Sequence, residues 1–393
     1  MDFRDTPEEA SFRAGLRAWL AENLPEGWGG RAPVVGHYDV EFQRTWSKKL
    51  YAAGYAAATW PVELGGGGLA PQYHGIFLEE TARADAPPHL GSIGLGMAGP
   101  TILAWGSPEQ KARLIPPLLS ADEVWCQGFS EPGSGSDLAG ARTRAVQDGE
   151  EWMVNGQKVW SSYAHLADWC ILIVRTDSDA ARHRSLSYLL VDMHSAGVEV
   201  RPLRQLTGDP EFNEIYFTDV RVPLASMLGA PGQGWEVAMT TLLHERGTLG
   251  FALTAHFEGL LSRLVSTARS VRSAGGRAAD DPFVRDGIAR CATDLEGLRY
   301  TNYRALTTLL KTGLPGPEGS AIKLYWSEAN QRLGKLAVEI LGPEGQLDGP
   351  EGFWAGYWAY QQLRSRGNTI EAGTSEILRN IIAERVVGLP RSR

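Results

Sequence analysis

The stretch Trp152-Met153-Val154-Asn155-Gly156-Gln157-Lys158-Val159-Trp160 marks the point where the sequence changes from a helical to a β-like pattern. Short runs rich in β-branched and aromatic residues stand on both sides of Asn155-Gly156. Asn-Gly is the two-residue loop that β-hairpins prefer. The sequence therefore predicts two strands here, joined by a turn at Asn155-Gly156.

The region that follows continues in short apolar runs, separated by polar or glycine-containing turns and without long helical segments. The predicted strands span residues 169–174, 186–191, 198–203 and 214–220. Several short strands in succession are typical of an antiparallel sandwich or barrel, here of roughly 110 residues.

The sequence before this region is helical. Thr6-Pro7-Glu8-Glu9 and Ser107-Pro108-Glu109-Gln110 each combine a hydroxyl N-cap, a proline at the first helical position and Glu or Gln two residues later. These are capping boxes, which mark helix starts. Further helices are predicted near 40–53 and 72–84, and Pro116-Pro117 is expected to interrupt the helix that begins at Pro108.

The sequence after residue 233 is helical again, with long segments of helix-forming composition at 234–274, 282–312, 318–341 and 373–387. The predicted fold class is therefore α+β and multidomain. Its parts are an N-terminal helical domain at 1–122, a middle antiparallel β-domain at 123–232 and a C-terminal helical domain at 233–393.

Composition excludes several classes of protein. The 393 residues carry 38 Lys+Arg and 46 Asp+Glu, a net charge of −8, which argues against a general nucleic-acid-binding surface. No run approaches the roughly 18–20 apolar residues that span a membrane. The N-terminus lacks the apolar core of a signal peptide. We therefore expect a soluble, cytoplasmic protein without a membrane span.

Motifs of metal and hydrolase chemistry are missing from the sequence. Cys126, Cys170 and Cys291 are far apart, and the eight histidines form no H-E-x-x-H pattern, so neither a disulfide framework nor a metal site is predicted. No G-x-S-x-G nucleophile motif occurs. Residues 94–99 match G-x-G-x-x-G, but they follow a helical stretch and precede Pro100. A dinucleotide fingerprint needs a strand before it and a helix after it, so close helix packing explains these glycines better.

Two segments near the predicted hairpin are candidates for a cofactor site. The glycines and serines of 129–137 expose N–H groups and hydroxyls that suit a phosphate, or they form only a polar turn after the first strand. Trp160 could stack on an aromatic cofactor beside the hydroxyls of Ser161 and Ser162, or it is a core residue.

Two helical segments are candidates for acid–base or anion chemistry. Glu245-Arg246 lies in the apolar segment 237–251, where burial would raise a carboxyl pKa towards that of a general base. Alternatively, Glu245 is exposed or paired with arginine. Residues 369–377 open the last helix, whose free N–H groups suit an anion or a carbonyl oxygen, or Thr374 or Ser375 merely caps that helix.

Taken together, four segments in this order resemble the acyl-CoA dehydrogenase family over nearly the whole chain. They are residues 128–137, 154–162, 212–223 and 373–380. The resemblance implies an N-terminal helical domain, a middle β-domain and a C-terminal four-helix domain, usually assembled as a tetramer.

The resemblance also implies FAD, bound without a covalent link between the β-domain and the C-terminal helices. Arg272 is the best match to an arginine that meets the FAD pyrophosphate from a neighbouring subunit, and Ser136 also matches a position that touches CoA. The other positions matched to FAD contacts are Gln127, Phe129, Ser130, Gly135, Ser136, Trp160, Ser162, Gly373, Thr374, Ser375 and Glu376.

The family's chemistry is a concerted dehydrogenation. A glutamate removes the proton α to the thioester carbonyl while the β-hydride moves to flavin N5, which gives a trans-2-enoyl-CoA. A flavin ribityl hydroxyl and a backbone N–H, here that of Ala372, polarise the carbonyl in the manner of an oxyanion hole. The electrons leave to an electron-transfer flavoprotein or a similar acceptor.

The sequence departs from the commonest family pattern at the catalytic base. Many members carry the glutamate immediately before Gly-Thr, where this chain has Ala372. The isovaleryl-CoA dehydrogenase branch instead places its base in a Glu-Arg pair on the first long C-terminal helix, which Glu245-Arg246 matches. Glu245 is therefore the predicted base, with Arg246 on the substrate side. The alternatives are Glu371, one residue out of register, and a base supplied by a partner chain.

A second departure concerns the cofactor. The family's Gly-Gly-x-Gly stretch reads Leu341-Gly342-Pro343-Glu344-Gly345 here, and Glu339 replaces a frequent glutamine, which leaves the FAD stoichiometry open. The leading hypothesis is an FAD-dependent acyl-CoA dehydrogenase in a homotetramer or an α2β2 heterotetramer. The second is a partner subunit of a heterotetramer that acts on bulky, ring-bearing acyl-CoAs. The third is a flavin oxidase or monooxygenase.

Overall fold

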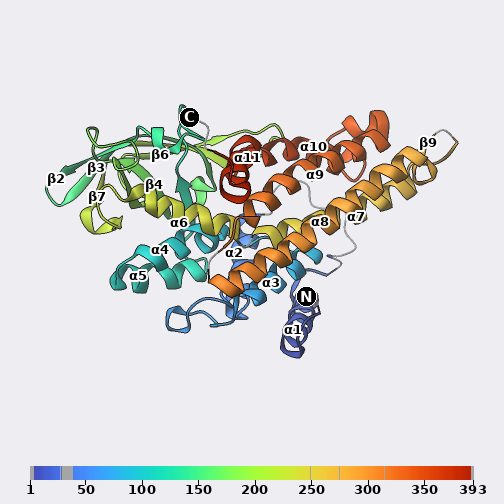
Figure 1. The fold of residues 1–393 in the computed structure, drawn as a ribbon, viewed down its shortest axis with the longest axis horizontal. Helices are drawn as coiled ribbons and strands as arrows, with labels where there is room; N and C mark the ends of the chain where they lie inside the picture. Colours follow the sequence, from blue (N-terminus) through green and yellow to red (C-terminus); the bar gives the residue numbers. More distant parts are fainter. Residues whose placement is uncertain are drawn as a thin grey trace. The chain divides into compact units, whose positions relative to one another are not determined.

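The computed structural model describes residues 4–26, 28, 39–247, 249–273, 275–313 and 315–390, without the side chains of 245–247, 249 and 273. The chain divides into two compact units (Figure 1). The β-unit comprises Asp39–Gly68 and Pro88–Glu245. The helical unit comprises Met1–Tyr38, Leu69–Pro87 and Arg246–Arg393.

An eight-stranded sheet forms the framework of the β-unit. Its strands run in the order β6-β7-β3-β2-β4-β5-β8, and β1 pairs with β4. The pairings are antiparallel except β1 with β4 and β2 with β4, so the predicted β-domain contains a mixed sheet. The strands are β1 Trp125–Gly128, β2 Arg144–Asp148, β3 Glu151–Ser162, β4 Trp169–Arg175, β5 Leu186–Asp192, β6 Val198–Leu203, β7 Phe212–Pro223 and β8 Met227–Leu228.

Helices cover one face of this sheet (Figure 1). They are α4 Gly99–Trp105, α5 Pro108–Leu119 and α6 Gly234–Gly247, and α2 Val40–Ala52 belongs to the same unit. Alternate residues of β4 enter different cores, as the two-residue period of a strand requires. Ile171 and Ile173 pack with α4, α5 and α6, whereas Leu172 and Val174 pack with β3 and β7 on the other face.

The predicted turn at Asn155-Gly156 is wrong, because β3 runs unbroken through both residues. Its pairing with β7 shifts register between Val154 and Gly156, which indicates a β-bulge. A Cβ atom on Gly156 would lie 2.5 Å from Thr143 Oγ1, so the glycine serves a close approach of β3 to Thr143. The turn between β2 and β3 falls at Gly149, whose φ is +63°.

The predicted interruption at Pro116-Pro117 is also wrong, since α5 continues to Leu119. Each proline lacks an N–H donor to the helix. The loss falls in the last turn and is offset by burial of Leu114, Ile115, Leu118 and Leu119. Both predicted capping boxes, at Thr6 and Ser107, are confirmed. Gly99 supports the packing interpretation of its motif, because a Cβ there would lie 2.3 Å from the Trp60 ring.

The helical unit is built around α7, α8, α9 and α10, which share one apolar core. Phe257, Leu298, Leu333 and Trp358 are buried members, one from each helix. The predicted segment 234–274 contains two helices, α6 and α7, and α10 was not predicted. The helices are α1 Pro7–Asn23, α3 Pro71–Arg83, α7 Leu249–Ser270, α8 Pro282–Thr312, α9 Glu318–Leu341, α10 Tyr357–Asn368 and α11 Ser375–Ile382.

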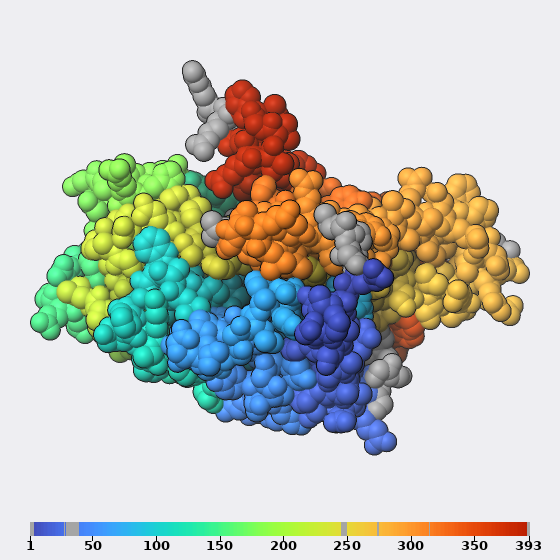
Figure 2. Space-filling model, turned by 60° about the horizontal axis from the view of Figure 1, so that its bottom comes forward, coloured from blue at the N-terminus to red at the C-terminus, as the bar shows by residue number. Residues whose placement is uncertain are grey.

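A short hairpin follows α7, formed by β9 Arg272–Ser273 and β10 Gly276–Arg277. It lies at one end of the α7–α8 pair in Figure 1, and this end of the helical unit is at the molecular surface in Figure 2. In the described ranges, the helices are too short or too polar to cross a membrane. The same ranges hold no cluster of three metal-ligating side chains.

Candidate active site

The loop 129–137 and the end of β3 lie side by side in the β-unit. The Val159 N–H donates a hydrogen bond to the Ser130 carbonyl over 2.9 Å. Within the loop, the main chains of Glu131 and Ser134 bond to each other twice, at 2.9 Å each, which closes a tight turn. The structure therefore brings together two of the segments that the sequence predicts for a cofactor.

The loop presents polar groups to open space. Gly135 and Ser136 are exposed, and Ser130 and Gln127 are half-buried. A Cβ atom built on Gly135 would have no other atom within 4 Å. Phe129 instead points inwards, 6% exposed and edge-on to Tyr188. Exposed N–H and hydroxyl donors on a turn are what a phosphate or pyrophosphate binds.

Trp160 is 60% exposed, so the alternative that it is a core residue is wrong. Its φ is +61°, a left-handed conformation that bulky residues rarely adopt and that often marks a functional site. The ring packs edge-on against Phe212, with centroids 6.1 Å apart. A broad aromatic surface is therefore held at the end of β3, next to the half-buried Ser162.

A buried ion pair ties the loop to β3. Lys158 is fully buried, and its Nζ lies 2.8 Å from Glu131 Oε1 and 3.1 Å from the Phe129 carbonyl. The Glu131 carboxylate also accepts the N–H groups of Arg142 and Thr143, over 2.7 Å and 2.8 Å. The pair thus fastens three backbone segments to one another.

Each member of this ion pair shifts the pKa of the other. Burial raises the pKa of the Glu131 carboxyl, but Lys158 and the two backbone N–H groups outweigh burial and hold it below its usual range. Burial lowers the pKa of Lys158, and Glu131 opposes that shift. No local sequence pattern marks either residue for this role, because such a buried contact arises only from tertiary folding.

In the helical unit, a strained turn precedes α11. Ala372 and Gly373 both adopt left-handed conformations, with φ values of +51° and +93°. Thr374 caps α11, because its hydroxyl accepts the Ile377 N–H over 3.3 Å, which confirms one of the two alternatives for this segment. Ser375 Oγ is buried and has no hydrogen-bond partner within the described part of the chain, whereas Glu376 is exposed. An unsatisfied buried hydroxyl is expected to meet a ligand or water.

Glu371 is held by its neighbours. Arg364 Nη2 lies 3.0 Å from one carboxylate oxygen, and Asn368 Nδ2 lies 2.7 Å from the other. Both oxygens are therefore engaged in hydrogen bonds. This arrangement argues against Glu371 as a proton acceptor.

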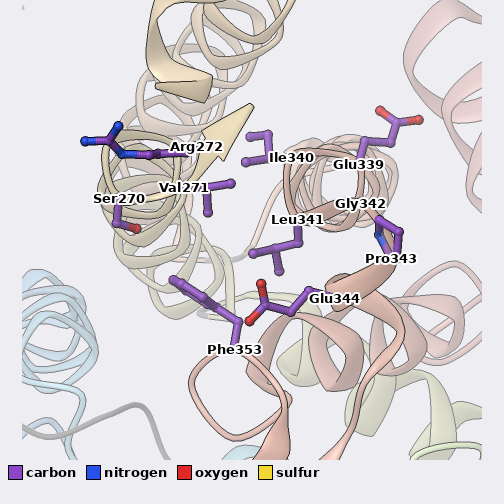
Figure 3. A pocket seen from close by; sticks show the side chains of 10 residues that line it. All are labelled: Ser270, Val271, Arg272, Glu339, Ile340, Leu341, Gly342, Pro343, Glu344 and Phe353. Carbon is purple, nitrogen blue, oxygen red and sulfur yellow. The ribbon is translucent and has the colours of Figure 1, made fainter. Parts of the chain in front are cut away.

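Arg272 lines an open pocket of about 540 Å³ in the helical unit. The same pocket is lined by Glu339 and by the stretch Leu341–Glu344. The structure therefore brings Arg272 together with the stretch that departs from the family's FAD-contact pattern. Figure 3 shows the Glu344 carboxylate pointing inwards, towards Phe353, whereas the Arg272 guanidinium points away from the pocket centre. The Glu339 carboxylate also points away in this view, so of the three charged groups only the Glu344 carboxylate faces the space expected to receive a pyrophosphate.

Glu245 and Arg246 belong to the last turn of α6. Their side chains lie outside the described residues, so their contacts are not part of the site geometry. Because Glu245 ends the β-unit and Arg246 begins the helical unit, the pair stands where the chain passes from one unit to the other.

In the β-unit, the exposed aromatic surface of Trp160 and the open turn of donors fit an FAD. In the helical unit, taken by itself, the buried Ser375 hydroxyl has no partner among the described residues and could donate to a ligand. The Arg272 pocket fits a pyrophosphate poorly, because the Glu344 carboxylate points into it and would repel the negative charge, whereas the Arg272 guanidinium points away.

Comparison with models of known families matches the chain in three consecutive parts. The N-terminal domain of acyl-CoA dehydrogenase matches residues 6–122, the middle domain 126–220 and the C-terminal domain 232–387. Acyl-CoA dehydrogenase IpdE1 of Mycobacterium tuberculosis (strain ATCC 25618 / H37Rv) is 44% identical over 387 residues, which cover 97% of each chain.

Two solved structures are similar over the full length of both chains. One is the Tcur3481-Tcur3483 steroid ACAD, with a TM-score of 0.87 and 31% identity. The other is the ChsE4-ChsE5 complex from Mycobacterium tuberculosis, with a TM-score of 0.86 and 31% identity. Each match covers 100% of this chain and 100% of the chain it is compared with.

Proposed function

Because this chain belongs to the acyl-CoA dehydrogenase family of oxidoreductases, we propose that it oxidises an acyl-CoA thioester to the trans-2-enoyl-CoA with FAD. One observation carries the proposal. The loop 129–137, with its exposed hydrogen-bond donors, lies beside the end of β3, where Trp160 is exposed. An aromatic surface beside phosphate-binding donors suits a dinucleotide flavin.

Glu245 is the proposed base for the α-proton. The position used by many family members is Ala372, which has no acid–base group, and the Glu371 carboxylate is engaged by Arg364 and Asn368. Among the glutamates considered from the sequence, Glu245 remains in register with a family base. Exclusion of water around a carboxylate raises its pKa towards the value that general-base catalysis needs.

The thioester carbonyl is the group that the protein must polarise, because an α-proton is too weakly acidic for an unaided carboxylate. The Ala372 N–H is proposed as one donor, aimed at the oxygen where charge develops. Arg246 and Ser136 are proposed on the substrate side, with Ser136 near the CoA chain. These groups bind and orient the substrate.

FAD, when bound, supplies the hydride acceptor at its N5 atom. The proposed holders in the β-unit are the backbone and side chains of Gln127, Phe129, Ser130, Gly135, Ser136, Trp160 and Ser162. Those in the helical unit are Gly373, Thr374, Ser375 and Glu376, whereas Arg272 is not among them, because its pocket fits a pyrophosphate poorly.

The direct test is the visible spectrum of the purified protein. We expect a yellow protein whose FAD is released by acid, and whose colour bleaches under anaerobic butyryl-CoA, octanoyl-CoA or cyclohexanecarboxyl-CoA. Bleaching reports transfer of substrate electrons to the flavin. A protein that stays colourless with added FAD, both alone and with a co-expressed partner, would reject the proposal.

A second candidate function is that of one subunit in an α2β2 heterotetramer acting on a bulky acyl-CoA. Two observations favour it. The names of two similar structures each pair two proteins, and Glu344 and Glu339 line the pocket expected to complete a neighbour's FAD site. In that assembly the Arg272 pocket of this chain would not complete the FAD site of its neighbour. An electron-transfer flavoprotein or a similar protein would accept the electrons.

The ratio of FAD to protein distinguishes a homotetramer from this heterotetramer. A homotetramer should hold one FAD per chain. The heterotetramer should co-purify with a second acyl-CoA dehydrogenase chain and hold one FAD for every two chains. Sedimentation that shows a stable, active monomer would contradict both assemblies.

A further inference from the structure

A buried lysine of α9 contacts the strained turn before α11. Lys323 is 3% exposed, and its Nζ donates a hydrogen bond to the Gly373 carbonyl over 2.7 Å. Lysine is rarely buried to this extent, because removing an ammonium from water is costly unless it is paired. This placement therefore calls for a reason beyond packing.

The turn itself needs support from its surroundings. Ala372 has a φ of +51°, a conformation that residues with a Cβ adopt only where the neighbouring structure enforces it. A Cβ built on Gly373 would meet only Leu378, at 3.5 Å and 3.8 Å, so this side of the turn is loosely packed. Polar contacts are therefore the stronger restraint on its conformation.

Helix α9 supplies those contacts at both sides of the turn. Asn330 Nδ2 donates to Asn368 Oδ1 over 2.8 Å, and Gln331 Nε2 reaches the Ser365 carbonyl and Thr369 Oγ1 at 3.1 Å each. These bonds fix the end of α10. Lys323 fixes the other side, at Gly373, so that Ala372 lies between two anchored points.

We propose that Lys323 is a positioning residue for substrate polarisation. It holds the Ala372–Gly373 turn, and its charge adds positive potential beside the Ala372 N–H. The inference rests on the proposed function, in which that N–H polarises the thioester carbonyl. A hydrogen bond from an ammonium is stronger than a neutral one, and a preorganised donor in a dry site stabilises a developing oxyanion most effectively.

The test compares Lys323→Met with Lys335→Met. Methionine keeps the length of the lysine stem but removes its charge and its donor. Lys335 is a matched control on the same helix, because it is 68% exposed and its Nζ lies 3.6 Å from Glu339 Oε1, in an ordinary surface ion pair. Both variants are loaded with FAD and compared with the wild type.

Two measurements separate positioning from ordinary stability. Hydrogen exchange of the 369–378 backbone is expected to accelerate roughly 10-fold in Lys323→Met. Flavin reduction by the acyl-CoA that bleaches the wild type fastest should slow by roughly 10-fold or more, with KM little changed. The infrared stretch of the bound thioester carbonyl should move to higher frequency, because the carbonyl is less polarised. Lys335→Met should match the wild type in all three.

Several results would overturn the inference. Wild-type exchange and reduction in Lys323→Met would show that the contact has no role. Faster exchange with a wild-type reduction rate and carbonyl stretch would show an ordinary structural contact. If Lys323→Met does not fold, Lys323→Gln keeps a neutral donor, and wild-type values there overturn the inference equally. Failure of the proposed function would look different from failure of this inference. The flavin of the wild type itself would then not bleach with acyl-CoA, while hydrogen exchange would still show whether Lys323 holds the turn.

Discussion

Glu245→Gln is expected to retain FAD and bind acyl-CoA, but to reduce the flavin at least ~10²-fold more slowly than the wild type. Glutamine preserves the shape of the side chain and its hydrogen bonding, but it cannot accept the α-proton. Loss of a general base typically costs about 10²–10⁴-fold, and more when proton and hydride transfer are concerted. Single-turnover bleaching under anaerobic acyl-CoA measures this step directly.

Glu371→Gln is the matched control for this prediction. Glu371 lies in the turn between α10 and α11, one residue before Ala372, the position where many family members carry the base. Its carboxylate is also engaged by Arg364 and Asn368, so we expect a much milder effect on bleaching. If Glu245→Gln bleached at the wild-type rate and Glu371→Gln bleached far more slowly, Glu371 and not Glu245 would be the base. If both variants were silent and the protein still turned over, the base would come from a partner chain.

The helix starts could be predicted from sequence because capping is local. The Thr6 and Ser107 boxes need only residues within one turn, and both form as expected. The Asn155-Gly156 turn failed for the opposite reason. There, the twelve-residue strand β3 pairs along most of its length with β7 and approaches Thr143 closely at Gly156. These long-range contacts outweigh the local preference of Asn-Gly for a hairpin loop.

Helix α10 shows a second limit of local reasoning. No side chain caps it, and the chain enters it through left-handed residues at Trp354, Ala355 and Gly356. Its buried aromatic residues, Tyr357 and Trp358, belong to the core of the helical unit. They indicate a helix only once that core is known. The sequence before residue 357 therefore carries no start signal that a capping rule would detect.

The candidate site divides in the same way. Its contact positions follow from a family resemblance and stay predictions, while the structure places the loop 129–137 beside the end of β3. The charged groups that hold the site, Lys158 with Glu131 and Lys323 with Gly373, could not be predicted. In a sequence such charges are normally assigned to the surface, and only the folded chain brings each to its partner.

Lys158→Met is expected to lower the free energy of unfolding of the β-unit by about 3–5 kcal/mol, because it leaves the Glu131 carboxylate buried without its cation. Urea unfolding followed by tryptophan fluorescence measures the change. Adding Glu131→Gln to Lys158→Met should recover part of the loss. The carboxamide is uncharged, yet its oxygen still accepts from the Arg142 or Thr143 N–H. Lys48→Met, at an exposed ion pair with Asp122, should change stability by less than about 1 kcal/mol.

The pH dependence of the same variant gives an independent check. The folded pKa of Glu131 lies below its usual range, so its contribution to stability is present above the unfolded pKa of about 4.3 and is lost as pH falls through the folded pKa. In Lys158→Met the attraction of the ammonium is gone, and burial, the largest influence on the pKa of Glu131, is opposed only by the two backbone N–H groups. The pKa of Glu131 should therefore be higher in the variant, so protonation costs the variant less than it costs the wild type. The stability gap between them should therefore be widest near neutral pH and should narrow in acid. A gap that is constant between pH 7 and pH 4, or below about 1 kcal/mol at pH 7, would show that the pair contributes no more than a surface salt bridge.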